Sequence, residues 1–136
     1  MFRITIAGLA FVLATSAVWA DIMPVPDVGP PAADIAGLSF MVQDVTVKYP
    51  PGYTKNQQVV ILTGCAEGTP NCALAKSNHV IGMEVLSAND TYLNPELGMV
   101  RQIVDAFQHN KWVTLELYAR DGGGNDSVKV RFAGSP

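Results

Sequence analysis

Few side chains in this sequence have the type and spacing that catalysis requires. The two histidines, His79 and His109, lie far apart, and neither has cysteine or acidic neighbours at the spacing of a metal site. No Gly-x-Ser-x-Gly motif marks an activated serine. The sequence therefore predicts a protein without enzymatic activity, metal or cofactor. A small hydrolase whose Ser, His and Asp meet only in space is the alternative.

Cys65 and Cys72 are the only cysteines. Six residues separate them, which fits neither a C-x-x-C redox motif nor the common spacings of zinc ligands. In an oxidising compartment such a pair forms a structural disulfide. The acids Asp121 and Asp126 flank three glycines and an asparagine, but the run lacks the ligand series of a calcium loop. We interpret it as a hairpin turn.

The first twenty residues have the pattern of a secretory signal peptide. Arg3 precedes the apolar run Ile4–Ala14, and cleavage is expected between Ala20 and Asp21. The alternative, an uncleaved anchor, is less suited because the run is short of the ~20 residues that span a bilayer. We expect a secreted or periplasmic protein with no membrane span after cleavage.

Removing Arg3 leaves 8 basic and 12 acidic side chains, a net charge of about −4. This balance argues against nucleic acid as the main partner, because binding its backbone requires a basic face. The remaining chain has the length of one domain. Four prolines deny a helix to 21–36, which we interpret as a linker, and the domain is expected over 37–134.

Short β-strands make up most of the predicted domain. Gly37–Tyr49 alternates with period two, but the phase changes at Gln43-Asp44, where we predict a β-bulge. Val59–Thr63 and His79–Leu86 are the next predicted strands. Pro50–Asn56 is expected to be a loop, and Cys65–Asn78 a turn-rich connection.

A helix followed directly by a strand is predicted over Asn94–Arg120. Asn94 suits the N-cap, Pro95 the first helical position, and Asn110 a left-handed C-terminal end next to His109. The helix's apolar stripe consists of Leu97, Val100, Ile103, Val104 and Phe107. The inward positions of the last two strands are expected to be Val113, Leu115 and Leu117, then Val128, Val130 and Phe132.

The resulting order β-β-β-α-β-β is that of the five-stranded oligonucleotide/oligosaccharide-binding (OB) barrel, mainly β with one helix. A small β-sandwich carrying a helix and an open α+β sheet are the alternatives. Such barrels bind ligands with two connecting loops. The candidate ligand-binding residues in those loops are Tyr53, Lys55 and Asn56, then Asp121, Asn125 and Asp126.

The chain also resembles the receptor-binding B subunits of bacterial A/B-type toxins, in the subtilase-cytotoxin and typhoid-toxin branch. The resemblance rests on a signal peptide, the first strand Gly37-Leu38-Ser39-Phe40-Met41-Val42, and the positions of Cys65 and Cys72. It also includes a helix with Ala106 that leads into a Val-x-Leu strand. The resemblance implies that Ser39 contacts a host glycan, that subunits form a pentameric ring, and that a catalytic A-type subunit is the partner.

We therefore expect an exported, non-enzymatic binding module that recognises a glycan or a protein surface. In a ring, weak individual sites would gain avidity from their effective concentration. The alternative is a periplasmic structural or inhibitory protein that acts through a flat protein–protein face and has no sugar site.

Overall fold

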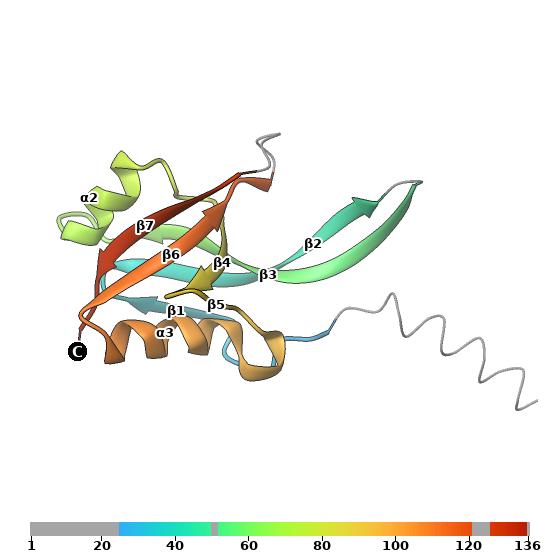
Figure 1. Ribbon diagram of the computed structural model, residues 1–136, viewed down its shortest axis with the longest axis horizontal. Coiled ribbons are helices and arrows are strands. Elements are labelled where there is room, and N and C mark those ends of the chain that lie inside the picture. Colours follow the sequence, from blue (N-terminus) through green and yellow to red (C-terminus); the bar gives the residue numbers. More distant parts are fainter. Residues whose placement is uncertain (1–24, 50–51, 121–125, 136) are drawn as a thin grey trace, which may run out of the picture. The chain divides into compact units, whose positions relative to one another are not determined.

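A computed structural model describes residues 25–49, 52–120 and 126–135. These residues are mainly β, with two α-helices and a short 3-10 helix (Figure 1). The strands are β1 (Ala32–Ile35), β2 (Leu38–Tyr49), β3 (Tyr53–Cys65), β4 (Glu84–Ala88), β5 (Thr91–Tyr92), β6 (Trp112–Tyr118) and β7 (Ser127–Ala133). The helices are α2 (Pro70–Ser77), the 3-10 helix η1 (Pro95–Leu97) and α3 (Met99–His109).

All seven strands belong to one antiparallel sheet in the order β1-β2-β3-β4-β6-β7, and β5 pairs with β4. The prediction of an OB-like five-stranded barrel is wrong. β4 pairs directly with β6, with Glu84 opposite Tyr118, so the strands follow one another as an open sheet. The open α+β sheet, one of the alternatives, is the observed architecture.

The chain divides into two units, which we describe separately. One contains Val45–Gln57, the far part of the β2–β3 hairpin, and the other contains 25–44 and 58–135. The alternation of buried and exposed residues in β2 changes phase where predicted, since Gln43 and Asp44 are both exposed in succession. The division between the two units falls directly after Asp44. In the hairpin part, the Thr46 hydroxyl donates to Asn56 Oδ1 at 2.9 Å.

The apolar face of the sheet packs against α3, which runs beside β1 and β6 in Figure 1. The ring of Phe107 lies between those of Phe40 and Phe132, with centroids 6.3 and 6.5 Å away. The predicted inward residues of β6 are all buried. In β7 the inward positions Val130 and Phe132 are buried, but Val128 is 43% exposed.

The predicted helix start is wrong, because Asn94 caps η1 and not α3. Gly98, with φ +84°, separates the two helices, and Leu97 in η1 is 58% exposed. The first turn of α3 is capped from outside the helix, since Met99 N–H donates to Asp27 Oδ1 at 2.7 Å. A carboxylate suits this end because the unpaired N–H groups make it positive.

The predicted left-handed end at Asn110 is also wrong, since its φ is −132°. Its side chain nevertheless donates to the Ala106 carbonyl at 3.0 Å, which satisfies one open carbonyl of the last turn. His109 lies in that last turn, as predicted.

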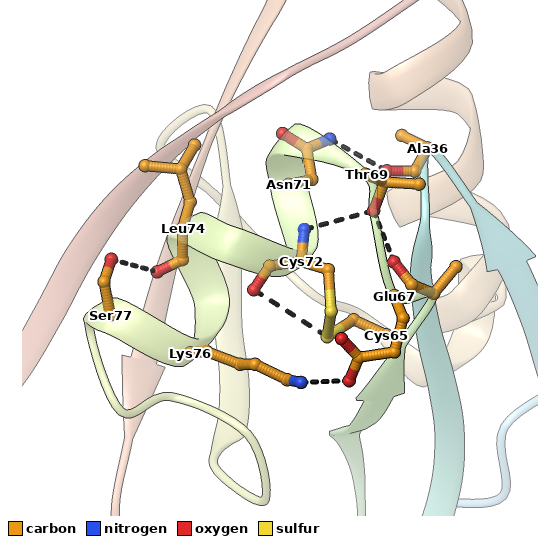
Figure 2. The surroundings of a disulfide bond; sticks show 10 residues. Ala36, Cys65, Glu67, Thr69, Asn71, Cys72, Leu74, Lys76 and Ser77 are labelled. Atoms are coloured by element: carbon orange, nitrogen blue, oxygen red, sulfur yellow. Dashed lines mark hydrogen bonds and ion pairs between the residues drawn. A yellow bond between two sulfur atoms is a disulfide. The ribbon is translucent and has the colours of Figure 1, made fainter.

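Cys65–Asn78 contains α2, which the sequence did not indicate (Figure 2). Thr69 caps it by accepting from Cys72 N–H at 3.3 Å, and Pro70 occupies the first turn. The predicted disulfide is present, with the Cys65 and Cys72 sulfurs bonded at 2.03 Å. A helix of eight residues is too short to show a clear apolar stripe, so the spacing of apolar residues in the sequence does not reveal α2.

The segment 21–36, interpreted as a linker, includes strand β1 from Ala32 onward. β1 pairs with β2, with Asp34 opposite Ser39. Upstream of it, Asp27 N–H donates to Gln58 Oε1 at 2.6 Å. The predicted signal peptide lies outside the described residues. Among the described residues, the helices all lack the length and hydrophobicity of a transmembrane segment.

Candidate functional site

The face of β6 and β7 that points away from the core carries aromatic and charged side chains. We call it the outer face; it consists of Trp112, Thr114, Glu116, Tyr118, Ser127, Lys129 and Arg131. Side chains of a strand point alternately to its two faces, and Val113, Leu115 and Leu117 of β6 are buried in the core. The residues between them therefore point to the outer face. The register places Glu116 opposite Lys129 and Thr114 opposite Arg131.

An exposed feature of the outer face is a cation–π pair. The guanidinium carbon of Arg131 lies 4.4 Å from the centre of the Trp112 ring, and the tryptophan is 45% exposed. Arginine over tryptophan is a favourable arrangement because the ring's face is negative. The pair therefore presents a large apolar surface and a positive charge at one place.

Glu116 is held at the centre of the outer face by two serines. The Ser87 hydroxyl of β4 donates to Oε1 at 3.1 Å, and the Ser127 hydroxyl of β7 donates to Oε2 at 2.5 Å. Because each carboxylate oxygen has its own donor, the side chain is fixed in one orientation.

A second carboxylate lies beside the outer face on β4. Glu84, with a side chain only 7% exposed, accepts from Arg120 Nε at 3.0 Å and from Arg120 Nη2 at 2.5 Å. The same guanidinium lies 5.9 Å from the centre of the Tyr118 ring. A buried carboxylate without a partner is costly, so Glu84 holds Arg120 in this position. The guanidinium held in this way contacts Tyr118.

The structure does not bring the predicted ligand-binding residues together in loops. Tyr53, Lys55 and Asn56 lie within β3, in the hairpin unit, so the loop predicted there is wrong at these residues. Ser39 lies on β2 in the other unit, and its carbonyl accepts from the Thr63 hydroxyl at 3.2 Å. Asp121 and Asn125 lie outside the described residues, and Asp126 is exposed just before β7.

The histidines have ordinary surroundings. His79 lies between α2 and β4 with φ +57°, and His109 Nδ1 lies 2.8 Å from the Asp105 carbonyl oxygen of its own helix. Over the described ranges, no group of three or more His, Cys, Asp or Glu residues could hold a metal ion.

Two shallow hollows are also present in the larger unit. One, of about 380 Å³, lies between α3 and the β4–β5 hairpin and includes Thr91, Gln102 and Asp105. The other, of about 430 Å³, borders the disulfide beside α2 (Figure 2), where Lys76 pairs with Glu67. Neither contains a buried polar side chain without a partner, because the described residues include none.

The predicted inward positions Val113, Leu115 and Leu117 leave Thr114, Glu116 and Tyr118 pointing outward, but sequence reasoning did not single out these three residues. The available signal was an aromatic and charged series at alternate positions on two strands expected to be neighbours. Comparison of the chain with protein-family models, with curated proteins and with solved structures finds no match.

Proposed function

We propose that this protein is an exported, non-enzymatic binding module that acts through protein–protein contacts on its outer face. The observation that carries the proposal is the exposed stack of Arg131 on Trp112. Tryptophan, tyrosine and arginine are the residues that most often dominate the binding energy of protein interfaces. The outer face spans two neighbouring strands, β6 and β7, so a protein partner could contact several of its side chains at once.

The fixed neighbours of the stack favour the same proposal. Glu116 is held by Ser87 and Ser127, and Arg120 by Glu84, so these side chains lose little freedom when a partner binds. Binding surfaces with such preorganised side chains avoid part of the entropic cost of association. The disulfide between Cys65 and Cys72 is compatible with a secreted or periplasmic location.

The test is site-specific photo-crosslinking in the cells that produce the protein. A photo-crosslinking amino acid at Thr114, on the outer face, should capture one discrete protein partner. The same amino acid at Leu97, which is 58% exposed in η1 beside α3 on the opposite face of the sheet, is the matched control and should not capture it. Adding Arg131→Glu should abolish the Thr114 product. Equal capture from both positions, or none from Thr114, contradicts the proposal.

Glycan recognition of the toxin B-subunit kind is the second candidate. It is favoured by Ser39, whose hydroxyl has no hydrogen-bond partner among the described residues and lies across from Asp34. A hydroxyl beside a carboxylate offers both a donor and acceptors to a sugar. Under this proposal subunits assemble into a pentameric ring and deliver a catalytic A-type subunit. Its site test is given in the Discussion.

A further inference from the structure

Strand β7 forms one edge of the sheet, and its main chain on that side is partly unpaired. At Ala133 the N–H donates to Asn71 Oδ1 at 2.9 Å, and the carbonyl accepts from Asn71 Nδ2 at 2.8 Å. Both groups of Ala133 therefore point away from β6. At the next residue the direction reverses, because Gly134 N–H donates to the Lys111 carbonyl at 2.7 Å.

The same alternation continues along β7. The β6–β7 register is regular from Trp112↔Ala133 to Tyr118↔Ser127, so every second residue of β7 points its N–H and C=O outward. These residues are Arg131, Lys129 and Ser127. Within 25–49, 52–120 and 126–135, no hydrogen bond from outside the sheet reaches the main chain of Lys129 or Arg131. The edge thus offers paired donors and acceptors to an added strand.

The side chains beside this edge indicate which strand would fit. On the core side Val128 is 43% exposed, although Leu117 opposite it is fully buried. On the outer face Lys129 and Arg131 are positive. Lys129 contacts Asp90 at 3.3 Å, but both groups are largely exposed, and such pairs contribute little.

We infer that β7 accepts an extended acidic segment of a protein partner as an additional strand of the sheet. The inference rests on the proposed function and names the chemistry of the partner. An apolar residue of the segment would cover Val128, and acidic residues at alternate positions would meet Lys129 and Arg131. Positive edge residues repel strands of like charge, so they select for an acidic one. A second copy fits less well, because β1, at the opposite end of the strand order, carries one acidic residue and packs against α3.

The probe is a fluorescein-labelled peptide of alternating glutamate and valine, seven residues long, measured by fluorescence anisotropy on the full chain. It should bind saturably, whereas a peptide of alternating lysine and valine should not. The same glutamate–valine peptide with N-methyl groups on its glutamates should lose binding, because the residues opposite Lys129 and Arg131 are those whose N–H groups face β7. No saturable binding of the glutamate peptide, or equal binding of its N-methylated form, overturns the inference.

The matched variants are Lys129→Pro and Lys129→Ala. Both remove the charge, but only proline removes the outward N–H, and it removes no hydrogen bond to β6. Lys129→Pro should bind the peptide at least ~10-fold more weakly than Lys129→Ala. Equal affinity of the two variants overturns the inference. If Lys129→Pro does not fold, the N-methylated peptide on the unaltered protein decides.

Two further readouts separate this inference from the proposed function. If the Thr114 crosslink persists in Lys129→Pro, the added strand is overturned while the outer face remains the binding surface. If the protein that carries the crosslinking amino acid at Thr114 and no other change captures no partner, the proposed function fails, whether or not the peptide binds. A dimer in sedimentation that Lys129→Pro abolishes would place a second copy on this edge and overturn the acidic partner.

Discussion

The side-chain amide of Asn71 pairs with the main chain of Ala133 as a neighbouring strand would. It accepts from the Ala133 N–H, donates to the Ala133 carbonyl, and also donates to the Ala36 carbonyl at 2.9 Å. Figure 2 shows the contact with Ala36 at the start of α2. One buried side chain from α2 thus joins the turn before β2 to the end of β7.

Asn71→Ala should therefore destabilise the fold severely. Asn71 is 4% exposed, and its removal leaves the N–H of Ala133 and two carbonyls without partners. We expect a loss of about 3 kcal/mol in the free energy of unfolding, measured by urea denaturation. Asn78→Ala at the other end of α2 is the control, because its bond to the Leu74 carbonyl is exposed; it should cost under ~1 kcal/mol. Equal losses would contradict this account.

Arg120→Ala should leave the carboxylate of Glu84 buried without its partner. The expected loss is about 3 kcal/mol in the free energy of unfolding, followed by thermal and urea denaturation. The double variant Glu84→Leu, Arg120→Ala should recover a large part of that loss, because no charge is then buried. A double variant as unstable as Arg120→Ala alone would show that the ion pair is not the cause.

Removal of the disulfide should lower stability by a moderate amount. The bond between Cys65 and Cys72 closes a short loop, which by the loop-entropy model contributes about 2–3 kcal/mol. Urea denaturation with and without a reducing agent measures the difference. Cys65→Ser, Cys72→Ser is the control, since a reducing agent should not affect it. An unchanged urea midpoint on reduction of the native chain would refute the prediction.

Gly134→Ala should disturb the end of β7. A Cβ at this position would collide with the carbonyl oxygen of Asn110, while Gly134 N–H is bonded to the Lys111 carbonyl. We expect a loss of about 1–3 kcal/mol, as for overpacking in a core. Gly64→Ala is the matched control, because a Cβ there meets no atom within 4 Å. Similar melting temperatures for the two variants would count against the collision.

Ser39→Ala tests the glycan site. Under the second candidate function it should weaken glycan binding on an array while leaving the melting temperature nearly unchanged, because the hydroxyl bonds to no described residue. Thr63→Ala, which removes the donor to the Ser39 carbonyl, is the comparison for a purely structural effect. Unchanged glycan affinity in Ser39→Ala would remove this residue from the site.

The sequence by itself determined which face of most elements is buried. The inward residues Val113, Leu115 and Leu117 and the helical residues Val100, Ile103 and Phe107 are in the core as predicted. Period two and period 3.6 are local properties, so they can be counted along the chain. The cysteine pair was equally readable, because no other cysteine competes for it.

Only the tertiary structure decided which elements meet. β4 pairs directly with β6, so the sheet is open and not the predicted barrel. The ligand site predicted at the loops of that barrel therefore loses its structural basis. Asp27 caps α3 from 72 residues away, and Asn71 bonds Ala133 across 62 residues. Such contacts join positions distant in sequence whose local patterns are independent, so no periodicity records them.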